Sequence, residues 1–145
     1  MLLEAPPRRG RPGTGSFRRS YVHEARAVPT ARHRLQTLRG TVDDQTLDGT
    51  ELLVTELVAN CVKHVEPGLG DLIRVQVLVF PEHVRGEVTD RGEGFAIADI
   101  DRAGEDPYGG WGLAMLDGMA ESWGFDLSHS TRVWFDLRRA ADRLR

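Results

Sequence analysis

The sequence predicts an α+β fold, a two-layer α/β sandwich with helices on one face of a mixed, mostly antiparallel sheet. Residues 72–89 contain two runs with the period of a half-buried strand, separated by a turn, which predicts a hairpin. Residues 42–65 carry apolar residues at helical spacing, and a second pair of strand-like runs covers 123–127 and 132–137. The order strand, two helices, hairpin, glycine loop, helix and hairpin segregates the helices on one side of the sheet.

The elements before the first hairpin begin and end at recognisable signals. Residues Phe17–Val22 are expected to form the first strand. Pro29–Thr30 is typical of a helix start, and Gly40 is typical of the end of that helix. Thr41–Asp44 has the spacing of a capping box, so a second, long helix is expected to begin there and to run to about Val65.

One domain of residues 16–138 is expected, with a short tail on each side. Residues 1–15 contain three prolines, three glycines and three arginines, which predicts a flexible tail. Residues 139–145 are expected to form a short C-terminal tail. The 145 residues of the chain are enough to bury one sizeable core.

Composition excludes several classes of function. The formal net charge of −3 gives no global positive field, so direct nucleic-acid binding is not expected. Cys61 is the single cysteine, which excludes an intrachain disulfide and a cysteine metal cluster. No apolar run approaches the ~20 residues of a membrane span, and the Pro6–Arg9 stretch argues against a secretory signal. We therefore expect a cytoplasmic protein without a membrane partner.

A ladder of polar side chains lies on the long helix. Glu56, Asn60 and His64 follow one another at four-residue spacing, so they share one face at the rim of the apolar arc. A carboxylate beside a cleft can accept a hydroxyl proton, and an amide oxygen is a hard ligand suited to Mg²⁺. Taken alone, the same residues are more typical of a solvated helix face with satisfied boundary residues, because the proposed roles need a phosphate nearby.

A first glycine loop follows the strand that ends near Asp90. Gly92 and Gly94 come directly after this carboxylate, so the backbone can approach a ligand that the carboxylate holds. On its own, the Asp-x-Gly-x-Gly spacing is also typical of an ordinary turn. The alternating acids of a calcium-binding EF-hand loop are missing.

A second glycine loop opens a short helix that we expect from Leu113 to about Ala120. Glycines before a helix expose free N–H groups at the positive end of its dipole, which suits a phosphate. The loop lacks the Gly-Lys-Ser/Thr of a Walker motif and the spacing of a dinucleotide fingerprint. A glycine hinge without a ligand is the alternative. The residues concerned are Gly109, Gly110, Trp111, Gly112 and Leu113.

The order of these three motifs resembles the GHKL (Bergerat-fold) ATPases. Within them, the chain is similar to the anti-sigma-factor serine kinases of the RsbW and SpoIIAB kind. The motifs span residues 56–113, and the order of helices and strands fits from about residue 16 to 138. The ending at 132–137 also looks like the last strand of that subfamily.

The resemblance implies a role for each motif in binding ATP. Asn60 would bind Mg²⁺ that bridges the ATP phosphates, and Glu56 would be the general base that accepts a proton from a substrate serine. Asp90 would accept a hydrogen bond from the adenine amino group. Gly92 and Gly94 would let their loop pack against the base.

The second glycine loop and the last strand would complete the nucleotide site. Residues 97–112 would form the ATP lid, and His64 would lie near the nucleotide. Family members often place a threonine beside the adenine just before the last strand. Here Thr131 is shifted by one place, or Arg132 replaces it. Trp111, between the lid glycines, is expected to pack rather than to cap the ligand.

The function that the resemblance implies is that of an ATP-binding anti-sigma factor with protein serine kinase activity. Its partners would be a sigma factor and a STAS-type anti-anti-sigma protein that carries the substrate serine, and relatives often form homodimers. The alternative is a nucleotide-binding regulatory protein that sequesters a partner without phosphorylating it. A histidine kinase fragment or a gyrase- or MutL-type ATPase is disfavoured, because no helical hairpin or transducer domain accompanies the motifs.

Overall fold

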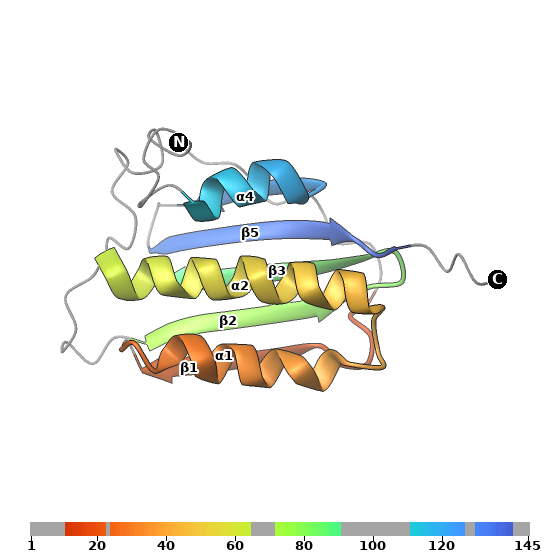
Figure 1. Ribbon diagram of the computed structural model, residues 1–145, viewed down its shortest axis with the longest axis horizontal. Coiled ribbons are helices and arrows are strands. Elements are labelled where there is room, and N and C mark those ends of the chain that lie inside the picture. Colours follow the sequence, from red (N-terminus) through yellow and green to blue (C-terminus); the bar gives the residue numbers. More distant parts are fainter. Residues whose placement is uncertain (1–10, 23, 65–71, 91–110, 127–129, 141–145) are drawn as a thin grey trace.

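Five strands and three α-helices make up the described part of the chain, which a computed structural model gives as residues 11–22, 24–64, 72–90, 111–126 and 130–140 (Figure 1). A short 3₁₀ helix, η1, follows the first α-helix. In chain order the elements are β1 (Phe17–Val22), α1 (Ala27–Leu35), η1 (Gln36–Leu38), α2 (Asp44–His64), β2 (Leu72–Val79), β3 (His83–Asp90), α4 (Trp111–Met119), β4 (Ser122–Asp126) and β5 (Thr131–Arg138).

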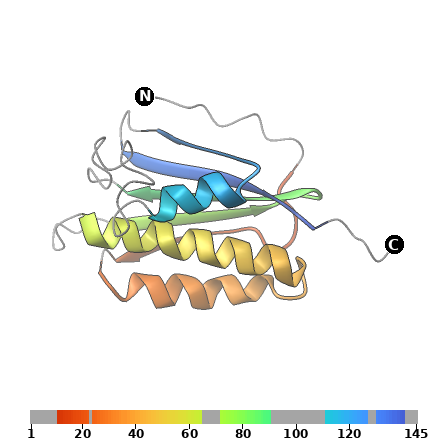
Figure 2. The same cartoon turned by 45° about the horizontal axis from the view of Figure 1, so that its top comes forward.

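The strands form one sheet in the order β1-β2-β3-β5-β4, and its four ladders are all antiparallel. Helices α1, α2 and α4 lie together on one face of this sheet, as the tilted view in Figure 2 shows. The α+β prediction is therefore confirmed, and so is the predicted order of strands and helices. The strand bounds agree with the sequence prediction to within one residue because period-two alternation marks them directly.

The core lies between α2 and the sheet. Every third or fourth residue of α2 is apolar, so one side of the helix can be buried along its length. The side chains that form this buried side are at most 1% exposed: Leu53, Val54, Leu57, Val58 and Cys61. They pack with sheet residues that alternate along the strands, among them Ile73, Val75, Val77, Val88 and Val133.

A buried ion pair joins β3 and β5 on the other face of the sheet. Arg85 is 2% exposed, and its guanidinium group donates to both carboxylate oxygens of Asp136, with Nε–Oδ1 at 2.7 Å and Nη2–Oδ2 at 2.6 Å. Ser122 Oγ donates to Asp136 Oδ2 at 3.2 Å, and the guanidinium carbon lies 4.9 Å from the centroid of the Trp134 ring. A two-pronged contact of this kind fixes the register of the two strands as well as satisfying the charges.

Two helix starts differ from the sequence prediction. Helix α1 begins at Ala27 rather than at Pro29, because proline is tolerated inside the first turn, where its missing N–H has no helical partner. Helix α2 is capped by Asp43 rather than by Thr41. The Asp43 carboxylate accepts hydrogen bonds from the Thr46 N–H at 2.9 Å and from the Thr46 hydroxyl at 2.6 Å.

The end of α1 and the start of α4 also differ from the sequence prediction. Helix α1 ends at Leu35 and continues as η1, and the chain turns at Gly40, whose φ of +86° suits glycine. Helix α4 begins at Trp111, two residues before the predicted Leu113, so Gly112 lies inside its first turn. Of the flexible tails predicted at 1–15 and 139–145, residues 1–10 and 141–145 lie outside the described residues. The described ends are attached to the domain instead, because the Gly13 N–H donates to Val79 O at 2.6 Å and the Arg139 N–H donates to Glu82 O at 2.9 Å.

We predict opposite effects for alanine at two glycines. A Cβ at Gly86 would overlap the Phe135 ring in the core, so Gly86→Ala should destabilise the fold by about 1–3 kcal/mol. Gly118, which is exposed within α4, has no atom within 4 Å of the position of a Cβ, so Gly118→Ala should stabilise the fold by about 0.5–1 kcal/mol. Urea denaturation of both variants measures the two effects. Equal stability of the two variants would contradict the packing described for Gly86.

Candidate functional site

The ends of four elements meet at one end of the domain. The C-terminal ends of α2 and β3 and the N-terminal ends of α4 and β5 lie together, on the left of Figure 1. Sequence reasoning selected residues on each of these elements. The antiparallel pairing of β3 with β5 brings together two of them that are distant in the sequence, Asp90 and Thr131.

Helix α2 contributes Glu56 and Asn60 to this end. The two residues are one turn apart, so they share a face of the helix. Asn60 is 7% exposed, and its Nδ2 has no hydrogen-bond partner within the described part of the chain. Glu56 is half-buried. A buried amide without a partner marks a place where a ligand can complete the hydrogen bonding.

Strands β3 and β5 contribute Asp90 and Thr131, which are directly opposite each other in the sheet. Asp90 is fully buried, and Thr131 is 4% exposed. The neighbouring Arg132 is opposite Thr89 instead, and its Nη2 lies 3.9 Å from Asp126 Oδ2. Since side chains alternate between the two faces of a strand, Thr131 and not Arg132 shares the face of Asp90.

Cys61 is a member of this cluster that sequence reasoning placed in the apolar arc and did not select. It is 1% exposed, on the side of α2 that packs on the sheet. Burial raises the pKa of the Cys61 thiol far above its ordinary value, and the charge of Asp90 and a side-chain hydrogen bond to it raise that pKa further. The sequence feature that could have indicated Cys61 as a site residue is its position directly after Asn60, on the side of α2 that faces the sheet.

Helix α4 begins at this end with Trp111, Gly112 and Leu113, whose side chains lie outside the described part of the structure. The first N–H groups of an α-helix have no partners within the helix, and the first turn of α4 contains no acidic residue. Its N-terminal end can therefore accept an anion.

Several predicted site residues fall where the structure gives no description. These are Gly92, Gly94, Gly109 and Gly110, together with residues 97–110 of the lid predicted at 97–112; its last two residues, Trp111 and Gly112, lie in α4. His64 is the last residue of α2, but its side chain also lies outside the described part. Within the described residues, no group of three or more His, Cys, Asp and Glu side chains could hold a metal ion.

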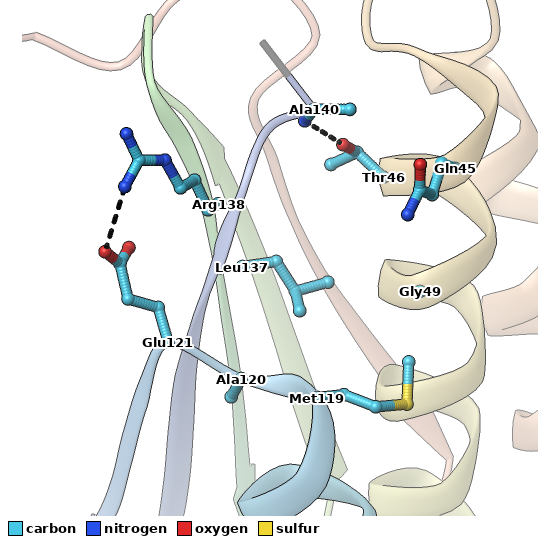
Figure 3. Close-up of a pocket in the computed structure, with 9 residues that line it drawn as sticks. All are labelled: Gln45, Thr46, Gly49, Met119, Ala120, Glu121, Leu137, Arg138 and Ala140. Atoms are coloured by element: carbon cyan, nitrogen blue, oxygen red, sulfur yellow. Dashed lines mark hydrogen bonds and ion pairs between the residues drawn. The ribbon is translucent and has the colours of Figure 1, made fainter.

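A separate pocket of about 490 Å³ lies at the other end of α2 (Figure 3). Along the helix, Gly49 in this pocket is roughly 16 Å from Asn60 at the ordinary helical rise. An ion pair of Glu121 with Arg138 at 4.0 Å borders the pocket. Its lining consists of Gln45, Thr46, Gly49, Met119, Ala120, Glu121, Leu137, Arg138 and Ala140.

The helices of the described residues include none that is long and apolar enough to cross a membrane.

Comparison with known proteins gives one family. A family model described as "Histidine kinase-like ATPase domain" matches residues 22–135, which is more than half of the chain. The matched range contains Glu56, Asn60, Asp90 and Thr131. The comparison with curated proteins found no match.

We predict that Cys61 is inert in the native protein. The thiol is 1% exposed and its pKa is raised, so little reactive thiolate forms and reagents have no access to it. The reaction with Ellman's reagent should be at least about 100-fold slower in the native chain than in urea, because it requires local opening. Rapid stoichiometric labelling of the native protein would contradict the burial of Cys61.

Proposed function

The chain belongs to the family of histidine kinase-like ATPase domains, and from this premise we propose that it binds ATP with Mg²⁺ and phosphorylates a protein serine. The observation that carries the proposal is the meeting of Asn60, Asp90 and Thr131 with the start of α4. Each group suits a different part of one nucleotide, and all belong to helices or strands of the fold.

The proposed site for the base is formed by Asp90 and Thr131. A buried carboxylate is an acceptor without a proton, so it suits the exocyclic amino group of adenine. Thr131 is directly opposite in the neighbouring strand and adds a hydroxyl group on the same face. Removing the carboxylate charge while keeping its shape should therefore weaken the binding of adenine nucleotides.

The proposed site for the phosphates lies between Asn60 and the first turn of α4. Because the Asn60 Nδ2 lacks a partner among the described residues, its amide can present either the oxygen to a metal or the nitrogen to a phosphate. One protein oxygen together with phosphate oxygens is the usual way in which nucleotide sites hold Mg²⁺. When bound, Mg²⁺ would neutralise the charge that develops on the phosphates.

Glu56 is the proposed general base. Its half-buried carboxylate is one turn from Asn60, on the phosphate side of the site. The serine oxygen would form a bond with the γ-phosphorus while the bond from that phosphorus to the ADP oxygen breaks. The hydroxyl proton would pass to the Glu56 carboxylate, which only has to orient and deprotonate the hydroxyl group.

The proposed partners follow from the resemblance of the motifs to anti-sigma-factor serine kinases. The substrate serine would belong to a STAS-type anti-anti-sigma protein in the cytoplasm, and a sigma factor would be the protein that the chain sequesters. Phosphorylating the antagonist would free the chain to hold the sigma factor. The alternative is a nucleotide-dependent binding protein without phosphotransfer, and mass spectrometry of an incubated partner separates the two.

We predict that Asp90→Asn weakens Mg-ATP binding by roughly 10- to 100-fold, because a hydrogen bond to a charged group is lost. Isothermal titration calorimetry with the full chain measures the affinity. Asp117→Asn, which removes an exposed carboxylate from α4, is the matched control and should bind like the wild type. Equal affinities of Asp90→Asn and the wild type would refute the base site.

We predict that Glu56→Gln keeps Mg-ATP binding but lowers phosphotransfer by about 10²- to 10⁴-fold, the usual contribution of a general base. Transfer is measured as the gain of one phosphate on a STAS-type substrate protein. Asp48→Asn, on an exposed position of the same helix, controls for a change of helix charge. Undiminished transfer by Glu56→Gln would remove Glu56 from the mechanism. No transfer by the wild type, with ATP bound, would favour the non-catalytic alternative.

A further inference from the structure

We propose that the pocket at the N-terminal end of α2 is a docking subsite for the protein that carries the acceptor serine, and that it receives one large apolar side chain of that protein. The proposal rests on the proposed function, because it adds a contact with the protein substrate outside the nucleotide site. What carries it is the position of the pocket, the exposed Leu52 and the proposed base Glu56 along one face of α2.

The pocket has a size and a lining that suit an apolar side chain. Its volume of about 490 Å³ is usual for pockets that bind small ligands. It lies between the first two turns of α2, the end of α4 and the end of β5 (Figure 3). Most of its lining is apolar and comes from Gly49, Met119, Ala120, Leu137 and Ala140.

The charged residues that line the pocket do not select a charged occupant. Glu121 and Arg138 are of opposite sign, and their side chains are 53% and 78% exposed. An exposed pair with its nitrogen and oxygen 4.0 Å apart contributes little to stability and adds no net charge. The part of the pocket that selects its occupant is therefore the apolar one, with Leu137 almost buried and Met119 exposed to solvent.

Two exposed apolar side chains lie at the pocket and beside it. Met119 is 41% exposed and lines the pocket, and Leu52 is 38% exposed one turn along α2 from Gly49. Large apolar side chains exposed to this degree are few in the described part of the chain, and the other two, Val22 and Leu72, are paired with each other across β1 and β2. Exposed apolar groups gathered beside a pocket are typical of a protein-binding site.

The same face of α2 continues from the pocket to the proposed base. At 100° per residue, Gly49, Leu52 and Glu56 point within about 60° of one another. Glu56 is roughly 10 Å from Gly49 along the helix axis, and Leu52 lies between them. Helix α4 runs beside α2 in the opposite direction, from the nucleotide end to the pocket (Figure 1). A protein whose serine reaches Glu56 would therefore cover Leu52 and reach the pocket.

This spacing defines the class of substrate. An extended chain advances about 3.3 Å per residue, so an apolar residue three positions from the serine would reach the pocket. On a helix, which rises about 1.5 Å per residue, the apolar residue would be seven positions away. The substrate is thus a protein with a large apolar side chain about 10 Å from its acceptor serine.

The first experiment separates docking from chemistry by the KM and kcat of phosphotransfer from Mg-ATP to a STAS-type substrate protein. Met119→Ala and Leu52→Ala should each raise the KM for that protein about 3- to 10-fold and leave kcat within about 2-fold, because the contact is the same in the ground state and the transition state. The matched control is Leu72→Ala, which removes a 48% exposed side chain from the sheet face opposite α2 and should change neither value. An unchanged KM in both pocket variants would overturn the docking subsite while the proposed function stands.

Calorimetry with Mg-ATP separates docking from an effect on the nucleotide site. Met119→Ala and Leu52→Ala should bind Mg-ATP within about 2-fold of the wild type, because Leu52 is roughly 12 Å from Asn60 along α2 and Met119 is at the far end of α4. Weakened nucleotide binding in these variants would contradict a docking role. If the wild type binds Mg-ATP but transfers no phosphate, the proposed kinase activity fails, and the docking of a substrate fails with it.

A cross-linking experiment identifies the occupant. Because Cys61 is the single native cysteine and is 1% exposed, Gln45→Cys at the pocket can be labelled selectively with a benzophenone maleimide. Irradiation with the substrate protein should join the label to a residue near the phosphorylated serine, which mass spectrometry locates. The same label in Leu72→Cys should give no such product. No product from Gln45→Cys, or a product with a second copy of the chain, would overturn the proposal.

Discussion

The packing of α2 across the sheet is the constraint on which the rest of the structure depends. Its 21 residues span roughly 30 Å, about the width of a small domain, so one helix reaches from the pocket at one end to the candidate site at the other. Leu53, Leu57 and Cys61 lie one turn apart and are at most 1% exposed. Because this side of α2 is buried, the directions of its remaining side chains follow from the rotation of about 100° per residue. A rotation by one residue would move Glu56 and Asn60 away from the rim and expose core residues.

The sheet carries three buried carboxylates, of Glu87, Asp90 and Asp136, and the last two differ in setting. Asp136 receives the guanidinium fork of Arg85, so its charge is neutralised and β3 is tied to β5. Asp90 is fully buried at the end of β3, directly opposite Thr131 of β5. Breaking a buried ion pair by removing one partner costs several kcal/mol, which is typical of a structural contact. Burying a carboxylate as completely as that of Asp90 has a desolvation cost, which is typical of residues kept for a binding role.

Much of the fold could be predicted from the sequence because it depends on local periodicity. The β2–β3 hairpin and the long helix are visible as runs of period 2 and 3.6. Helix starts were less predictable, because Thr41 and Asp43 are both good caps and packing decides between them. In the site, the choice between Thr131 and Arg132 required the register of β5 on β3, and the Cys61–Asp90 contact joins elements far apart in the sequence. Neither leaves a local pattern.

The adjacency of Asn60 and Cys61 explains how a single helix can serve two parts of one ligand. Consecutive helical residues differ by about 100° in direction and 1.5 Å in height. Cys61, which is 1% exposed, therefore faces the sheet, while Asn60, which is 7% exposed, lies at the rim in line with Glu56. In the proposed function, the base would be bound on the sheet side of α2, where Cys61 lies, and the phosphates would be bound at the rim, where Asn60 lies. Their separation would be set by the covalent geometry of α2, so any shift of the helix would disturb both contacts together.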